Sequence, residues 1–110
     1  MDLNLTVLIG RVAAEPELRE FESGSRLLRL LVTVKTGEPR RRVDVIPVTL
    51  WEADDNRNSF DDLADLRVGQ RVSIAGSTQR RFWSEPEGRR SRIEVVAEQI
   101  ATLDDKADAA

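Results

Sequence analysis

The chain has 110 residues, of which 40% are hydrophobic, and a formal net charge of −3, which predicts one globular domain with its own core. It contains no cysteine and no histidine. The absence of cysteine excludes disulfides and thiolate chemistry. The absence of histidine removes the commonest metal ligand and the commonest general base, so we expect neither an enzyme nor a metal or cofactor. No apolar run approaches the roughly 18 residues of a membrane span, and the start lacks a basic signal region, so we expect a cytoplasmic protein that does not contact membranes.

The amino-terminal third predicts two strands joined by a loop. Residues 3–9 alternate between apolar residues at odd positions and mostly polar ones at even positions, which is typical of a half-buried strand. Gly10 is expected at a bend or bulge. Residues 13–22 contain a proline and mixed charges and predict a connecting loop, which ends in a Ser-Gly-Ser turn at 23–25.

Two further strands follow, over residues 26–35 and 43–51. In the first of them the apolar positions 28, 30, 32 and 34 share one face, whereas the other face mixes cations with leucines and is either an open binding face or a subunit contact. In the second, Ile46, Val48 and Leu50 share one face, and the opposite face carries Val43, Val45, Thr49 and Trp51. Residues 36–42 predict a loop that carries an arginine triplet, which is either a solvated surface or part of a binding groove.

One helix is predicted after these strands. Ser59 is expected as its N-cap, because an acidic residue follows three positions later. Phe60, Leu63 and Leu66 form its apolar stripe, and Gly69 is the stop signal. The neighbouring carboxylates lack the spacing of a metal loop and indicate a solvated face; they are Asp54, Asp55, Asp61, Asp62 and Asp65.

A long hairpin is predicted from residue 71 onward, with its tip at 85–88 and its second arm running to about residue 103. Its arms carry five arginines and two adjacent aromatics between residues 80 and 92. Cations suit phosphates and flat rings suit unstacked bases. Because its neighbours are arginines, we expect Trp83 to contact bases, with packing on its own arm of a solvated hairpin as the alternative. Phe82 points to the opposite face of the strand, and we expect it to pack in the core.

Five strands with one helix between the third and the fourth predict an all-β fold, the five-stranded Greek-key OB-fold barrel. We expect this domain to span residues 1–103, followed by a short disordered acidic tail at 104–110. OB-folds bind oligonucleotides across their strand 2–3 face and the adjoining loops.

The charge distribution supports a polyanionic ligand despite the negative total. Residues 35–42 and residues 80–92 each carry a net charge of +3, which leaves −9 for the rest of the chain. Two local positive windows on an acidic body can attract phosphates, because contacts within about one Debye length dominate.

Six segments, in order along the chain, resemble bacterial single-stranded DNA-binding proteins: residues 4–11, 15–19, 45–51, 68–76, 79–83 and 93–97. The resemblance covers about residues 3–103. It implies an OB-fold that wraps single strands without sequence preference, in replication, repair or recombination. It also implies a homo-oligomer, commonly a tetramer built from dimers, or a dimer.

The resemblance places Trp51 and Trp83 on stacking positions, with a core or interface role as the alternative for Trp51. It places Arg80, Arg81 and Arg90 among basic contacts and matches Arg11 and Arg19 to family arginines, of which Arg19 has a structural alternative. The full set of expected DNA-binding residues is Arg11, Lys35, Arg40, Arg41, Arg42, Trp51, Arg80, Arg81, Trp83, Arg89, Arg90 and Arg92.

The chain also departs from the family pattern. Val45 stands where an aromatic is frequent, Arg92 lies near a position that is often aromatic, and the chain has no tyrosine. The chain as given ends without the acidic, phenylalanine-tipped peptide of the family, so we expect no partner recruitment through such a tail. A specialised paralogue is therefore the alternative: an OB-fold protein–protein module that uses Leu27, Leu31 and Leu66. A third hypothesis is an RNA-preferring binder.

Overall fold

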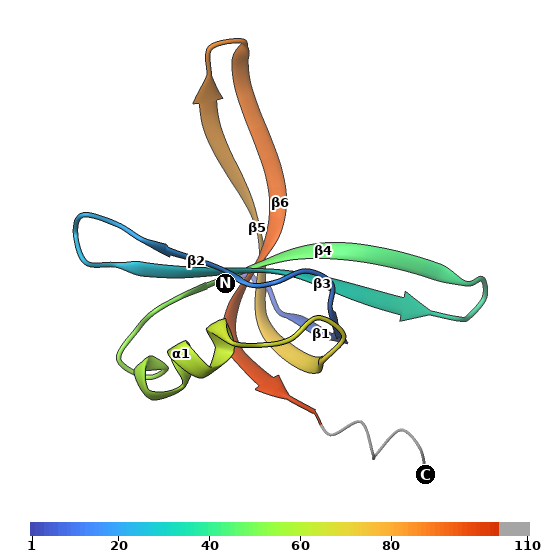
Figure 1. Ribbon diagram of the computed structural model, residues 1–110. Helices are drawn as coiled ribbons and strands as arrows, with labels where there is room; N and C mark the ends of the chain where they lie inside the picture. Colours follow the sequence, from blue (N-terminus) through green and yellow to red (C-terminus); the bar gives the residue numbers. More distant parts are fainter. Residues whose placement is uncertain (104–110) are drawn as a thin grey trace.

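The computed structural model describes residues 1–103, which form six strands and one helix (Figure 1). The elements are β1 (Thr6–Val12), β2 (Glu17–Glu20), β3 (Arg26–Thr36), β4 (Arg42–Trp51), α1 (Arg57–Ala64), β5 (Arg71–Glu85) and β6 (Gly88–Thr102). The tail predicted at residues 104–110 lies outside the described residues.

Five of the strands close into a barrel. The sheet order is β1-β5-β6-β4-β3-β2, and an additional pairing of β1 with β3 joins the two sides. This closing contact is short, with Arg11 opposite Thr33 and Val12 opposite Val32. Only β4 and β6 run parallel; the other pairs are antiparallel. A closed five-stranded barrel with one helix between β4 and β5 confirms the predicted OB-fold.

The alternation predicted for the two central strands is confirmed by their burial. Leu28, Leu30 and Val32 of β3 lie in the core, as do Val48 and Leu50 of β4. The helix adds a stripe of three buried side chains to this core, namely Phe60, Leu63 and the following Leu66. α1 therefore covers one end of the barrel, on the side opposite the β5–β6 hairpin (Figure 1).

The first strand differs from its prediction in position and in orientation. It begins at Thr6 and continues to Val12, through Gly10 and without a register shift against β5. A Cβ at Gly10 would lie 2.4 Å from the carbonyl oxygen of Thr33. This glycine thus permits a close approach of β3, and the predicted bend or bulge is wrong.

The odd-numbered apolar face of β1 points to solvent. Leu5, Val7 and Ile9 are each at least half exposed, whereas Leu8 and Val12 pack against the core. An alternating pattern identifies two faces, but the face with more apolar residues is not always the buried one.

A sixth strand, β2, occupies part of the segment that was predicted as a loop. It pairs with β3 at the sheet edge, with Glu17 opposite Arg29 and Arg19 opposite Leu27. All four of its side chains are exposed. Such an edge strand carries no buried face and therefore leaves no apolar alternation in the sequence.

The helix begins earlier than predicted. Its N-cap is Asn56, and Ser59 lies inside the first turn, where its hydroxyl donates to the carbonyl of Asn56 at 3.1 Å. The side chain of Asn56 instead organises the preceding turn, since its Oδ1 accepts from the Ala53 N–H and its amide donates to the Trp51 carbonyl. Ser59 as N-cap is therefore wrong. The helix also ends earlier than predicted, at Ala64 with Asp65 as its C-cap, so Gly69, whose φ is 91°, lies in the turn beyond the helix and the predicted stop is wrong.

Arg26 ties the helix to the start of β3. Its Nε donates to Glu52 Oε2 at 3.2 Å and its Nη1 donates to Asp61 Oδ1 at 2.9 Å. The guanidinium also lies 5.0 Å from the ring centroid of Phe60. The hydrogen bond from Arg26 holds the pKa of Glu52 below its usual value.

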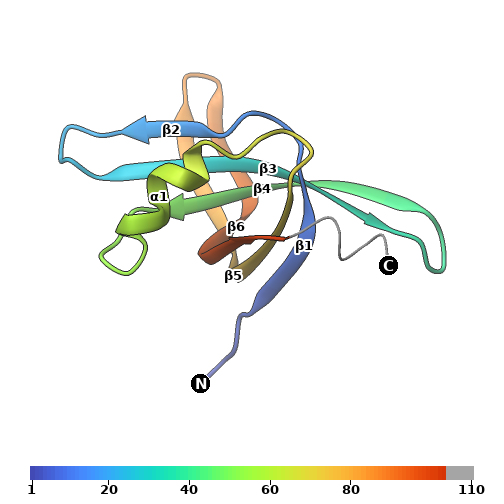
Figure 2. The ribbon, with the colours of Figure 1, turned by 60° about the horizontal axis from the view of Figure 1, so that its bottom comes forward.

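The β5–β6 hairpin stands away from the barrel, whereas the β2–β3 and β3–β4 turns project in other directions (Figures 1 and 2). It pairs continuously to its tip, where Glu85 lies opposite Gly88, as predicted. A bulge lies between Ala75 and Gly76, at the point where the hairpin leaves the barrel. A Cβ at Gly76 would lie 2.0 Å from the carbonyl oxygen of Val96, so the strands meet there only because position 76 is glycine.

Candidate nucleic-acid interface

The side chains that point out of the barrel on β2, β3 and β4 form one continuous surface. Arg19, Leu27 and Trp51 lie opposite one another in one cross-strand row, and Glu17, Arg29 and Thr49 form the next. Further along β3 and β4 the rows are Leu31–Pro47, Thr33–Val45 and Lys35–Val43. Side chains two residues apart share a face at a spacing of about 6.7 Å. The surface therefore extends for roughly 27 Å from the row of Trp51 to that of Lys35.

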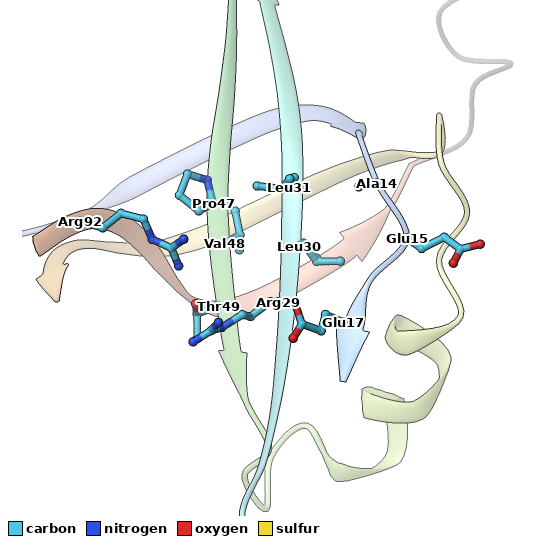
Figure 3. A pocket seen from close by; sticks show the side chains of 10 residues that line it. All are labelled: Ala14, Glu15, Glu17, Arg29, Leu30, Leu31, Pro47, Val48, Thr49 and Arg92. Atoms are coloured by element: carbon cyan, nitrogen blue, oxygen red, sulfur yellow. The ribbon is translucent and has the colours of Figure 1, made fainter. Parts of the chain in front are cut away.

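The β5–β6 hairpin meets this surface and closes a hollow against it. The hollow has a volume of about 330 Å³ and is lined by four arginines and one tryptophan: Arg19, Arg29, Arg81, Trp83 and Arg92. A second hollow of about 270 Å³ shares Arg29 and Arg92 and continues along β3 and β4 to Leu31 and Pro47. In Figure 3, Arg29 extends from β3 across β4 to lie beside Thr49, while Arg92 approaches from β6.

Two carboxylates accompany these cations. Glu94 is buried and accepts a hydrogen bond from Thr49 Oγ1 at 2.9 Å, and its Oε2 lies 3.5 Å from Arg92 Nη2. Glu17 accepts from Arg19 Nε at 3.2 Å. Burial lowers the pKa of Arg29 first, and the neighbouring arginines lower it further. An arginine nevertheless remains charged at neutral pH, so the hollow is a strongly electropositive, partly dehydrated site.

Trp83 is fixed in place on the hairpin by a carboxylate. Glu85 Oε1 accepts a hydrogen bond from the indole Nε1 of Trp83 at 3.0 Å. Glu85 Oε2 lies 3.3 Å from Nε of Arg90, which is the cross-strand neighbour of Trp83. The residue remains 37% exposed. A flat apolar surface is thus held at the edge of the arginine hollow, where it can stack on a planar group.

A second aromatic site lies at the end of β4. Trp51 stacks on Phe21, with the ring centroids 5.6 Å apart and the planes at 26°, and both residues are exposed. Leu27, the cross-strand neighbour of Trp51, is only 1% exposed, although it points out of the barrel. Phe21 is not among the residues predicted from the sequence, because it directly follows β2, which lies in a segment predicted as a loop.

Phe82 does not pack in the core, and that prediction is wrong. It is 54% exposed, and the Arg89 guanidinium lies 4.7 Å from its ring centroid. Phe82 lies on the part of the hairpin that extends beyond the barrel, where neither face of the strand contacts the core. Arg80 and the exposed Ile93 are paired on this same face, and Arg80 donates to Ser91 Oγ at 3.1 Å. Arg80 and Arg89 therefore lie on the opposite face from Trp83.

Most of the other predicted cations lie outside the arginine hollow. Arg11 and Lys35 line a hollow of about 290 Å³ together with Arg71, which sequence reasoning missed. The arginine triplet lies around the β3–β4 turn, where Arg42 pairs with Asp44 at 3.0 Å. The structure thus brings Arg81, Trp83 and Arg92 together and adds Arg19 and Arg29, but leaves Arg40 and Arg41 on a separate tip (Figure 1).

Two further observations concern residues 1–103. No group of three or more acidic, histidine or cysteine side chains in this range is arranged to hold a metal ion. No helix in this range has the length and apolar character needed to cross a membrane.

Of the leucines expected to form a partner surface, Leu27 and Leu66 are buried, and only Leu31 is exposed.

The closed barrel, its outward-facing sheet surface and the hairpin with clustered arginines and an exposed indole define a barrel of the oligonucleotide-binding class. The sequence model of the single-strand binding protein family matches residues 3–103, and the chain belongs to this family. The resemblance noted in the sequence is thereby confirmed.

Relatives and a solved structure agree with this assignment. The chain is 29% identical over 112 residues to "Single-stranded DNA-binding protein 1" of Nostoc sp., covering 98% of this chain and 89% of the relative. It is 30% identical over 110 residues to "Single-stranded DNA-binding protein 1" of Staphylococcus aureus, covering 94% and 67%. The "Single-stranded DNA-binding protein" of Deinococcus radiodurans is 27% identical, and the chain spans about a third (34%) of its length. A structure described as "Plasmodium falciparum SSB complex with ssDNA" has a TM-score of 0.77 and 23% identity, covering 94% of this chain and 97% of the other. This similarity shows the same fold.

Proposed function

We propose that this chain binds single-stranded DNA without sequence preference and protects it in replication, repair or recombination. The observation that carries the proposal is the hollow between the hairpin and the outer sheet face, where four guanidinium groups and an exposed indole meet. The names of the relatives from Nostoc, Staphylococcus and Deinococcus support the same ligand. The function is binding without a catalytic step, and it needs no metal or cofactor.

The binding mechanism combines charge with stacking. Arg81 and Arg92 neutralise backbone phosphates, while Trp83 and the Trp51–Phe21 pair offer flat surfaces to unstacked bases. Every base has a π-face, so such contacts tolerate any sequence. Phe21 partly compensates for the valine at position 45, since it adds an aromatic ring to the same outer surface.

Salt dependence and a matched pair of double variants test this function. If about five phosphates are neutralised, affinity for a dT oligonucleotide of about thirty bases should fall about a hundredfold between 50 and 200 mM salt. The double variant Arg81→Gln with Arg92→Gln should bind more weakly and with a smaller salt slope. The control Arg57→Gln with Arg67→Gln removes the same charge from exposed sites in or just after α1 and should bind nearly as the wild type does. Equal effects of the two pairs would contradict the proposal.

We also propose that the protein is a homo-oligomer, and that copies meet on the exposed apolar face of β1. Leu5, Val7 and Ile9 line this face, and between Thr6 and Gly10 the strand pairs only with β5. An exposed apolar row on a partly open strand is typical of a contact surface. Val7→Lys should shift the sedimentation coefficient toward the monomer, whereas Val68→Lys, at a similarly exposed valine outside the strands, should not.

The compartment that goes with this function is the cytoplasm, at the nucleoid.

A further inference from the structure

Arg29, a residue of β3 that the sequence did not single out, lies at the centre of the arginine hollow. We propose that Arg29 is the central residue of a binding site for one phosphodiester group of the bound strand, with Arg19, Arg81 and Arg92 around it. This inference rests on the proposed single-strand binding and specifies where within that surface one backbone phosphate is held.

Arg29 carries a buried hydrogen-bond donor without an acceptor. The Nε of Arg29 is shielded from solvent and has no hydrogen-bond partner among the described residues; no other side-chain atom of residues 1–103 has this status. Burying a hydrogen-bond donor without an acceptor is costly, so native proteins pair nearly all such groups. The Nε itself is not open to the hollow, so a ligand there meets the rest of the Arg29 side chain, which has no competing hydrogen bond to the described residues.

Positive charge in and around the hollow exceeds negative charge. The four guanidinium groups of the hollow meet two carboxylates, Glu17 on Arg19 and Glu94 on Arg92. Arg29 and Arg81 form no ion pair within residues 1–103. Two positive charges are therefore uncompensated, and repulsion from Arg19, Arg81 and Arg92 is among the causes that lower the pKa of Arg29. An anion in the hollow relieves this repulsion.

The side chains of the hollow also favour one kind of anion. A guanidinium is a planar fork whose donors match two oxygens of a phosphate at once. Trp83 lines the same hollow, so one site offers charge to a phosphate and a ring to a base. Glu17 and Glu94 at the edges disfavour a highly charged free anion and suit the single charge of a phosphodiester. These features together favour a nucleotide within a strand.

The experiment combines two variants at position 29 with direct observation of the Arg29 Nε–H by ¹⁵N NMR. Arg29→Met keeps most of the side-chain length but removes the charge, and Arg29→Lys keeps the charge but removes the fork. With the dT oligonucleotide, Arg29→Met should weaken binding about ten- to a hundredfold and reduce the salt slope by about 0.7. Arg29→Lys should keep the slope and lose part of the affinity. In the wild type, the Nε–H signal, assigned by its loss in both variants, should shift when the oligonucleotide is added.

A second readout separates a ligand-binding role from a structural one. Because Arg29 is desolvated and unpaired in the free protein, Arg29→Met should leave the Tm of the free protein unchanged or raise it. Unchanged affinity and slope in Arg29→Met, with wild type binding the oligonucleotide, would overturn this inference alone. Failure of the wild type to bind would refute the proposed function itself. If millimolar inorganic phosphate shifts the Nε–H signal and the oligonucleotide does not, the hollow is a free-anion site and the inference is wrong.

Discussion

Trp83 and Phe82 are adjacent but lie on opposite faces of the β5–β6 hairpin, so we predict different contributions of the two residues to DNA binding. Trp83 faces the arginine hollow, and Phe82 points to the other side of the ribbon, where Arg89 lies over its ring. Both rings are exposed, and neither belongs to the core cluster. Replacing either with alanine should therefore change the free energy of unfolding little, and the two variants are matched in chain position and in chemistry.

The expected size of the effect follows from base stacking. A stacked base contributes about 1–3 kcal/mol by alanine substitution, and each 1.4 kcal/mol is tenfold in affinity. Trp83→Ala should thus weaken binding of the dT oligonucleotide about 5- to 150-fold, while Phe82→Ala should leave it within about threefold of wild type. Trp83→Phe should recover part of the loss, because it restores a ring without the indole N–H that Glu85 orients.

Fluorescence anisotropy with a labelled oligonucleotide measures both affinities, and circular dichroism verifies that both variants are folded. A larger loss for Phe82→Ala than for Trp83→Ala would refute the assignment of the interface to the Trp83 face. The strand would then lie along Phe82 and Arg89, away from the hollow.

The remaining predictions concern the fold. Gly76→Ala should lower the Tm, because its methyl group would overlap the Val96 carbonyl at 2.0 Å and overpacking costs about 1–3 kcal/mol. Gly37→Ala is the control, since its methyl group meets nothing within 4 Å. Equal Tm values for the two variants would contradict the close approach of the strands at Gly76. Glu52→Gln should lower the Tm at pH 7 but not in acid. The folded-state pKa of Glu52 is depressed by Arg26, so its contribution to stability is present above its unfolded pKa and lost as the pH falls through the folded value. A Tm difference that persists unchanged at low pH would refute that assignment.

The central strands were predictable because they have a buried face. β3 and β4 carry alternating apolar residues that fill the barrel, so their sidedness followed from periodicity alone. The hairpin was equally clear, since its two arms flank a tip with turn residues. Errors fell where burial does not control the pattern. β2 is an exposed edge strand, β1 shows its more apolar face to solvent, and Phe82 lies beyond the end of the core.

The candidate site was only partly predictable for a similar reason. Clustering of charge in the sequence pointed to Arg81 and Arg92, which lie on the hairpin together with Trp83. Arg19 and Arg29 are distant in sequence and isolated among other residue types, and only the pairing of β2 with β3 brings them to the hairpin. Conversely, the arginine triplet is dense in sequence but lies at a turn outside this hollow.

The most direct test of the central claim is the intrinsic tryptophan fluorescence of the wild-type chain during titration with the dT oligonucleotide at low salt. Trp51 and Trp83 are the only two tryptophans, and both are partly exposed on the proposed surface. We predict strong quenching by the single strand and little by duplex DNA of the same length. No quenching and no binding of the single strand would contradict the account.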